Sequence, residues 1–317
     1  MIQNGSGKLD LLNLANDFLE YLVVTKNRSI LTIADYRHYL NRFLDWLNQN
    51  HPGSQPSDVN METVRQYRLY LAHFRNRNSV PLKRVTQTYH IIALRSFLRY
   101  LLVQRDISTL SPDKIELPKP ASRSVSFLNS EQLERLLNSP KIDNEMGLRD
   151  RTILEVLFST GLRVSELVHL NRDQIDLKRK EFSVRGKGDK FRVVFLSDVA
   201  AHWLERYLRT RRDTFKPLFI RYSGPVDVRR DGEKMRLTAR SIQKIVENYA
   251  KKCGLSLEVT PHTLRHSFAT DLLMAGADLR SVQEMLGHAS IRTTQVYTHV
   301  TNKHLKEVHQ AFHSRNK

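Results

Sequence analysis

Residues 260–268 read Thr-Pro-His-Thr-Leu-Arg-His-Ser-Phe, and this stretch carries the densest structural signal in the chain. Thr260 is suited to cap a helix and Pro261 to take its first position, where a missing backbone N–H costs nothing. His262 and Arg265 then stand three residues apart on one helical face, near the positive end of the helix dipole. Such a face favours a bound anion, and a phosphate group fits it.

Glycines mark the ends of two further helices that present chemically useful side chains. A strongly apolar helix over residues 153–158 is expected to stop at Gly161, and Arg163 follows it directly. A later helix, capped by Asp278, is expected to stop before His288. Taken alone, Arg163 is better explained by pairing with a nearby carboxylate, and His288 could be a capped loop histidine.

After residue 176 the sequence period changes from helical to alternating. Apolar residues recur at every second position in two runs, Phe182 and Val184, then Phe191, Val193 and Phe195. This pattern predicts two strands, and the Gly-Lys-Gly-Asp turn at 186–189 joins them as an antiparallel hairpin. Lys187 is therefore expected at the hairpin tip, where it either solubilises the surface or delivers a proton to a bound substrate.

The first 105 residues have the pattern of an all-helical domain. Apolar residues at three-and-four spacing predict four helices, over about 11–22, 32–47, 60–74 and 84–103. The second helix is expected to begin near Thr32, and Asn60 is expected to cap the third. Four amphipathic helices can share one core.

Between residues 106 and 127 the periodicity lapses, and prolines alternate with polar residues, which predicts a linker. Residues 128–317 then form a second domain, mainly α-helical with a small antiparallel β-sheet. A chain of 317 residues is long enough to build two separate cores.

The chain is strongly basic, with 51 Lys and Arg against 33 Asp and Glu, a formal net charge of +18. This excess favours a polyanionic partner such as nucleic acid. The single cysteine, Cys253, excludes an intrachain disulfide and a cysteine-based metal cluster. Without a membrane-spanning apolar run or a secretion signal, a cytoplasmic protein with no membrane partner is expected.

Basic side chains gather at two places in the first domain. They are Arg75, Arg77, Lys83 and Arg84 around the turn before the fourth helix, and Arg95 and Arg99 one turn apart on that helix. Together they are predicted to bind phosphates along a DNA groove. For any one of them, a solvated surface position is the alternative.

Six side chains of the second domain form a chemically coherent set: Arg163, Lys187, His262, Arg265, His288 and Tyr297. They supply nitrogen donors, a histidine that can move protons, and a phenol nucleophile. The set is suited to breaking and remaking a phosphodiester without a metal.

The sequences of five runs, 161–167, 186–188, 262–266, 286–288 and 297–300, resemble those of the tyrosine recombinase (lambda integrase-like phage integrase) family, and most closely its Xer-type site-specific recombinases. The resemblance implies a SAM-like four-helix core-binding domain over 1–105, a linker over 106–127 and a catalytic domain over 128–317. All six positions hold the family's residue types, and the extended loop at 222–234 departs from its pattern.

The resemblance implies a role for each residue in DNA strand exchange. Arg163 and Arg265 would bind the non-bridging phosphate oxygens through paired donors that lysine cannot copy, with a further hydrogen bond from His288. Glu166 would only orient its neighbours.

Tyr297 would attack the phosphate, with His262 accepting its proton and Lys187 protonating the departing 5′ oxygen. The product would be a 3′-phosphotyrosyl link, and exchange with a partner duplex would pass through a Holliday junction without a metal, ATP or another cofactor.

The end of the chain carries an apolar stripe at Leu305, Val308 and Phe312. By resemblance it docks into a neighbouring protomer, in a homo-tetramer, or a hetero-tetramer with a paralogue, on two double-stranded DNA sites. A septal DNA translocase is a possible further partner. The histidines of this segment have no accompanying carboxylate or cysteine cluster, so no metal site is expected.

Three alternatives share parts of this pattern. A type IB topoisomerase would use nearly the same chemistry, but it has no need of a tail that links protomers. A non-catalytic DNA-binding protein would share the charge, but it has no need of the six residues. A mobile-element integrase differs from a recombinase that resolves chromosome or plasmid dimers only in its DNA site.

Overall fold

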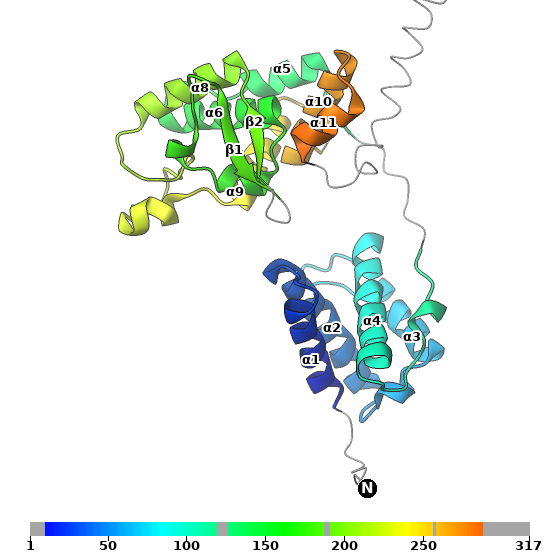
Figure 1. Ribbon diagram of the computed structural model, residues 1–317. Helices are drawn as coiled ribbons and strands as arrows, with labels where there is room; N and C mark the ends of the chain where they lie inside the picture. The colour runs from blue at the N-terminus through cyan, green and yellow to red at the C-terminus, as the bar shows by residue number, and fades with distance from the viewer. Residues whose placement is uncertain (1–9, 119–125, 187–190, 256–257, 288–317) are drawn as a thin grey trace, which may run out of the picture. The chain divides into compact units, whose positions relative to one another are not determined.

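The computed structural model describes residues 10–118, 126–186, 191–255 and 258–287. The chain divides into two compact units, Met1–Ser122 and Arg123–Lys317, which are taken separately below (Figure 1). In the described part of the chain, no helix is both long and apolar enough to cross a membrane.

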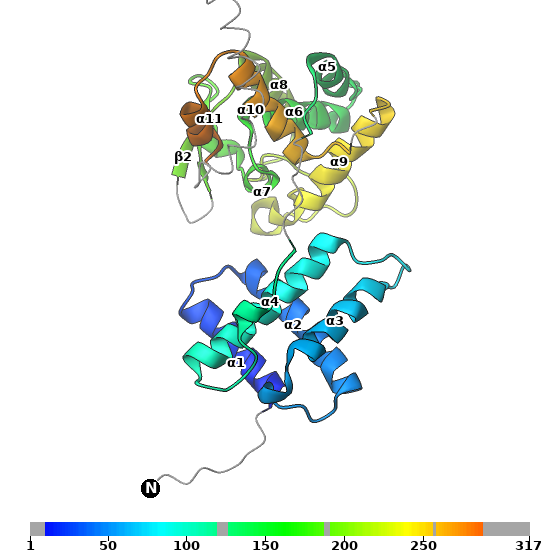
Figure 2. The same cartoon turned by 90° about the vertical axis from the view of Figure 1, so that its right-hand side faces the viewer.

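The first unit contains the four predicted helices, α1 (Leu11–Val24), α2 (Ile30–Asn50), α3 (Met61–His73) and α4 (Arg84–Gln104). Figure 2 shows them packed side by side. Large apolar and aromatic side chains fill the space between them, among them the fully buried Phe18, Phe43, Tyr67 and Phe97. The prediction of a helical first domain is confirmed.

Side-chain caps mark the starts of α2 and α3 in this unit. Asn60 caps α3 as predicted, because its side chain accepts a hydrogen bond from the backbone N–H of Thr63 at 3.0 Å. The predicted start of α2 near Thr32 is wrong by two residues: Ser29 is the cap and Ile30 the first helical residue. Ile30 and Leu31 are 88% and 79% exposed, so they lie outside the buried stripe that the pattern detects.

After α4, the chain continues to pack against the core of the first unit. A short 3-10 helix (Pro112–Lys114) leads to Ile115, which is 1% exposed in the core of the four helices. Leu128, by contrast, belongs to the core of the second unit. The segment expected as a linker over 106–127 therefore packs on the first core along much of its length.

The second unit is mainly helical with one small sheet. Its elements are α5 (Ser130–Asn138), α6 (Glu145–Thr160), α7 (Val164–Val168), β1 (Glu181–Arg185), β2 (Phe191–Phe195), α8 (Asp198–Thr210), α9 (Ala239–Lys252), α10 (Pro261–Met274) and α11 (Leu279–Leu286), with short 3-10 turns at Arg172–Gln174 and Arg229–Met235. Helix α6 is buried over most of its surface and packs against α8 and α10. The prediction of a mainly α fold with a small antiparallel sheet is confirmed.

The two strands form the predicted antiparallel hairpin, in which Val184 pairs with Arg192. Phe182 and Val184 of β1 are buried. On β2, however, the apolar residues that gave the alternating pattern point outward, since Phe191 and Phe195 are 72% and 56% exposed. The inward face of β2 is formed by Val194 and Arg192, whose side chain is largely buried.

Gly161 ends α6 at the point where three helices of the second unit meet. Its φ of +58° lies in the left-handed region, which favours glycine. A Cβ atom there would lie 2.5 Å from Cδ1 of Phe268 on α10 and 2.9 Å from Cδ2 of Leu286 on α11. The close approach of α6, α10 and α11 therefore requires glycine.

We expect Gly161→Ala to destabilise the second unit by about 2–4 kcal/mol, through left-handed strain and overpacking together. Gly254→Ala is the matched control, because Gly254 has a φ of +65° and no atom within 4 Å of the place that a Cβ would take, so only the strain of about 1–2 kcal/mol remains. Urea unfolding followed through Trp203, in a Trp46→Phe background, measures both. Equal losses for the two variants would contradict the packing account.

Candidate active site

The start of α10 has the capping geometry that the sequence predicts. Thr260 is the cap, its hydroxyl accepts from the backbone N–H of Thr263 at 3.3 Å, and Pro261 takes the first position. Arg265 follows one turn into the helix and is only 3% exposed. Its guanidinium donates to the carbonyl oxygens of Gly161 at 2.5 Å and Leu286 at 2.6 Å, so it joins the ends of α6 and α11.

Arg163 lies at the N-terminus of α7, two residues after the end of α6. Its Nη1 donates to Oε1 of Glu166 at 2.8 Å, and its backbone N–H donates to Oε2 of the same carboxylate at 2.8 Å. Nη2 reaches the carbonyl oxygen of Gly287 at 3.1 Å. The side chain remains 26% exposed, so part of the guanidinium faces solvent.

The C-terminus of α11 is held by three arginines from three different elements. The carbonyl oxygens of Met285, Leu286 and Gly287 accept hydrogen bonds from Arg192, Arg265 and Arg163 respectively. Helix ends leave such carbonyls unpaired, and cations are favoured beside them. Because these carbonyls are consecutive, the three guanidinium groups are gathered at one place.

Glu166 is the counter-charge of this cluster. It is 8% exposed and also accepts from Nη1 and Nη2 of Arg192, each at 2.9 Å, so each carboxylate oxygen has two donors. Burial by itself raises the pKa of this carboxyl, but the hydrogen bonds and charges of Arg192 and Arg163 outweigh it and hold the pKa at about 2. Glu166 is therefore ionised at every physiological pH.

His262 lies on the first turn of α10, beside the arginine cluster. Partial burial, with the charges of Arg265 and Arg163, lowers the pKa of this imidazole. Its neighbour His266 is affected in the same direction, and burial, His262 and Arg265 lower its pKa to about 4. Both rings are thus neutral at pH 7, and neutral imidazole has an acceptor nitrogen.

The structure brings together four of the predicted site residues, Arg163, Glu166, His262 and Arg265. Lys187, His288 and Tyr297 lie outside the described residues, as do Leu305, Val308 and Phe312 of the tail. The described chain resumes at Phe191 after Lys187 and ends one residue before His288.

Sequence reasoning missed Arg192. One feature of the sequence could have indicated it, since Arg192 is the only cation among the five residues of β2. The alternating apolar residues of this strand favoured burial of the opposite face, so Arg192 was not expected to face inward. Within the described ranges, no group of three His, Cys, Asp or Glu side chains could hold a metal ion.

The six basic residues predicted to contact DNA lie in two separate places on the first unit. Arg75, Arg77, Lys83 and Arg84 are exposed around the turn between α3 and α4. Arg95 and Arg99 lie further along α4, about 22 Å from Arg84 for the more distant one, and both pair with Asp113. The six therefore form two groups, and their contact with DNA stays a prediction.

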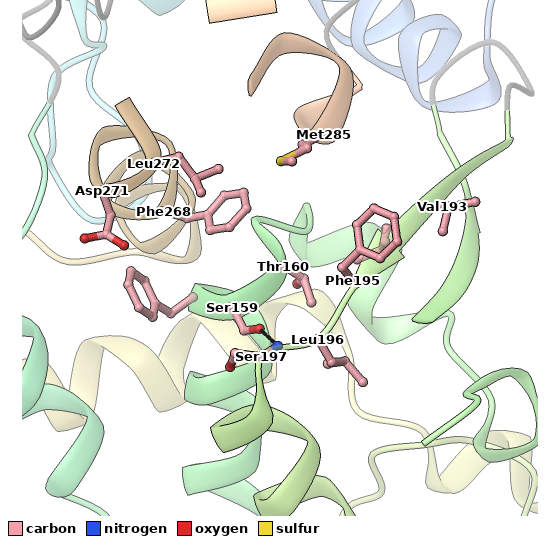
Figure 3. Close-up of a pocket in the computed structure, with 12 residues that line it drawn as sticks. Ser159, Thr160, Val193, Phe195, Leu196, Ser197, Phe268, Asp271, Leu272 and Met285 are labelled. Carbon is pink, nitrogen blue, oxygen red and sulfur yellow. Dashed lines mark hydrogen bonds between the residues drawn. The ribbon is translucent and has the colours of Figure 1, made fainter. Parts of the chain in front are cut away.

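An apolar pocket of about 360 Å³ lies beside the outward face of β2. Figure 3 shows Phe195 of β2, Phe268 and Leu272 of α10, and Met285 of α11 around it. Its polar rim includes Ser159, whose hydroxyl accepts from the backbone N–H of Ser197 at 2.7 Å. The exposed apolar face of the strand is thus continuous with a concave apolar surface.

Comparison with protein families agrees with the fold. Residues 126–304 match the phage integrase family, and residues 15–105 match the SAM-like N-terminal domain of phage integrases. The chain belongs to the phage integrase family, whose members are tyrosine recombinases, enzymes that cut and rejoin DNA. The first match spans all six positions that the sequence singled out.

The relatives are Xer recombinases, and this chain aligns with them along nearly their whole length. The chain is 40% identical over 310 residues to tyrosine recombinase XerD of Listeria innocua, covering 96% of this chain and 99% of that protein. It is 39% identical to XerD of Lacticaseibacillus casei, covering 94% and 98%. Tyrosine recombinase XerC of Pelotomaculum thermopropionicum is 38% identical, covering 95% and 98%.

Solved structures share the fold. The crystal structure of XerA recombinase is 29% identical, covers 97% of this chain and 100% of that chain, and has a TM-score of 0.51. XerH site-specific recombinase, bound to palindromic difH substrate, is 22% identical, covers 98% and 92%, and has a TM-score of 0.68.

The carboxylate of Glu166 gives the second unit a defined pH dependence. Its folded pKa of about 2 lies below the ordinary 4.5, so its stabilisation is complete above about pH 4.5 and is lost as the pH falls towards 2. We expect the stability difference between wild type and Glu166→Gln to shrink by about 2 kcal/mol between pH 6 and pH 3. Urea unfolding through Trp203, in the Trp46→Phe background, measures it.

Glu205→Gln is the control, because Glu205 forms an exposed pair with Arg209 on α8. Its stability difference from wild type is expected to vary little over the same range. A Glu166→Gln difference that stays constant with pH would show that the two arginines do not hold this carboxylate ionised.

Proposed function

We propose that this chain is an Xer-type site-specific recombinase that resolves chromosome or plasmid dimers in the cytoplasm. It would exchange strands between two copies of a specific double-stranded DNA site through a 3′-phosphotyrosyl intermediate and a Holliday junction. The observation that carries the proposal is the cluster of Arg163, Arg265 and the neutral His262, set in a chain whose relatives are Xer recombinases along almost their whole length.

The arginine cluster supports the binding of a phosphate in its transition state. A phosphodiester resists attack because its negative charge repels nucleophiles, and charge accumulates on the non-bridging oxygens as the fifth bond forms. Arg163 and Arg265 are fixed in advance by carbonyl oxygens at the ends of α6 and α11. Donors that are already oriented need little reorganisation when the charge develops.

The tyrosines of the second unit point to Tyr297 as the nucleophile. The unit has four, and Tyr207 is fully buried. Burial raises the pKa of Tyr222, while burial and Asp150 raise the pKa of Tyr249 to about 12. Phenols whose pKa is raised in this way are poor nucleophiles, which supports Tyr297 for this role.

In the proposed step the Tyr297 oxygen forms a bond to phosphorus, and the bond from phosphorus to the 5′ oxygen breaks. His262 accepts the phenolic proton, because its lowered pKa keeps the imidazole neutral. Lys187 gives a proton to the departing 5′ oxygen, and His288 donates a hydrogen bond to the phosphate. One ester replaces another, so rejoining by a partner 5′ hydroxyl needs no ATP.

The first unit would hold the duplex. Its exposed cations Arg75, Arg77, Lys83 and Arg84 can contact phosphates at the turn between α3 and α4. Arg95 and Arg99 would have to exchange Asp113 for phosphate, so their contribution is expected to be smaller.

The tail would link protomers in a tetramer on two DNA sites. The apolar stripe Leu305, Val308 and Phe312 needs an apolar partner, and the pocket beside β2 offers one (Figure 3). The exposed Phe195 and the lining Leu272 give the pocket the same chemical character as the stripe. A paralogue as second protomer and a septal DNA translocase as activator are the further partners of this proposal.

The nucleophile is tested with a DNA substrate nicked near the cleavage position, which loses a short fragment and traps the covalent complex. Wild type is expected to form a protein–DNA adduct on denaturing gels, and Tyr297→Phe none. Tyr249→Phe is the matched control, because its hydroxyl only donates to Asp150 at 3.1 Å. Adduct formation by Tyr297→Phe on the correct site would contradict the assignment.

The protomer contact is tested with a chain cut after Thr301 and with Phe195→Asp. Both are expected to keep binding of single protomers to DNA but to lose the four-protomer complex in gel-shift assays. Phe191→Asp is the control, because Phe191 lies on the same outward face of β2 but does not line the pocket. A normal four-protomer complex with Phe195→Asp would place the tail elsewhere.

A mobile-element integrase of the same family remains the second candidate, because solved relatives of the same fold include the Tn1549 transposon integrase, at 20% identity and a TM-score of 0.66. Selection of bound DNA from a random pool identifies the site. Recombination between two identical selected sites supports dimer resolution, whereas a requirement for two different sites supports integration.

A further inference from the structure

Arg192 lies where three parts of the proposed site meet. Its side chain is 12% exposed, and its fork makes two parallel hydrogen bonds to the two oxygens of Glu166. Its Nε donates to the carbonyl oxygen of Met285 at 3.1 Å. The Arg192 guanidinium thus joins strand β2 to Glu166 of α7 and to the C-terminus of α11.

The carboxylate it holds is fully occupied. Glu166 accepts two donors from Arg192 and two from Arg163, one of which is the Arg163 backbone N–H. Two carboxylate oxygens offer about four acceptor sites, so none is left over. The position of Arg163 therefore depends on a carboxylate whose two oxygens are also held by Arg192.

The hydrogen bond from Arg192 to the end of α11 also constrains the Arg163 guanidinium. Arg163 also donates to the carbonyl oxygen of Gly287, two residues after the carbonyl that Arg192 holds. A Cβ on Gly287 would lie 3.0 Å from Cδ of Arg192, so the aliphatic stem packs against this turn as well. Arg192 therefore constrains both partners of the Arg163 guanidinium, Glu166 and the end of α11.

We propose that Arg192 is a positioning residue for DNA cleavage, which acts through Glu166 and the α11 terminus to direct the Arg163 guanidinium at the scissile phosphate. We assign it no contact with the substrate, because its Nε, Nη1 and Nη2 each donate within the protein and its side chain is only 12% exposed. The inference rests on the proposed function and adds to it a residue outside the six. Lysine cannot replace it, since an ammonium has no planar fork for two parallel bonds.

The expected kinetic effect follows from displacement. A shift of the catalytic group by about 1 Å can cost about 100-fold in rate. Arg192→Gln and Arg192→Lys are therefore expected to lower the single-turnover rate of covalent-complex formation by about 100-fold, while the affinity for DNA changes less than about threefold. Arg179→Gln is the control, since Arg179 is 76% exposed beside β1.

Two modified DNA substrates then identify the group through which Arg192 acts. A methylphosphonate at the cleavage position lacks one negative charge, so it depends less on a correctly placed Arg163. We expect the loss in Arg192→Gln to fall to about tenfold or less on this substrate. A phosphorothiolate with sulfur at the 5′ bridging position has a good leaving group that needs no proton, and it should leave the loss unchanged.

Rescue by the phosphorothiolate instead would mean that Arg192 acts through the proton donor Lys187, and this would overturn the proposal. Wild-type rates in both Arg192 variants would overturn it as well. The fluorescence of Trp203 reports whether each variant folds. If Arg192→Gln does not fold, the double variant Arg192→Met, Glu166→Gln replaces it in the test, because it leaves no buried charge unpaired at this pair. If wild type itself forms no adduct on the selected site, the proposed function fails, which is a different outcome.

Discussion

The paired hydrogen bonds between Arg192 and Glu166 are the constraint on which the geometry of the site depends. Arg163 is exposed enough that, without a fixed acceptor, its long side chain would sample many rotamers. Glu166 supplies that acceptor, and Arg192 keeps Glu166 in one orientation. The cost of burying the carboxylate is offset because every lone-pair direction is used, which is the condition under which a buried ion pair is tolerated.

The second constraint is the backbone at the end of α11. Helix C-termini expose carbonyls that need donors, and here the donors are Arg192, Arg265 and Arg163. Under the proposed function, the groups that bind the phosphate would also stabilise the helix end, since each guanidinium that donates to these carbonyls is also aligned by them. Gly161 makes this possible, because only glycine lets the end of α6 approach Phe268 and Leu286 closely enough for its carbonyl to reach Arg265.

Local signals explain why much of this could be predicted from sequence. Caps such as Thr260 and Asn60 and the left-handed glycine Gly161 act within a few residues, so helix ends were predicted well. The face of β2 was not predictable in the same way. A strand of five residues buries whichever face its tertiary partners require, and the partner of Arg192 is Glu166, 26 residues earlier. The start of α2 was missed for a related reason, because Ile30 is apolar but exposed.

The charge balance of the described site favours an anion. Arg163 and Arg192 share the carboxylate of Glu166, while Arg265 donates to the carbonyl oxygens of Gly161 and Leu286 at helix ends. The three guanidinium groups meet at the C-terminus of α11, and Arg265 is nearly fully buried there. Under the proposed function, a phosphate bound between Arg163 and Arg265 would be stabilised by these charges, and the transition state, with more charge on its oxygens, would be stabilised more. Such a site would stabilise the transition state more than the bound substrate, which is what catalysis requires.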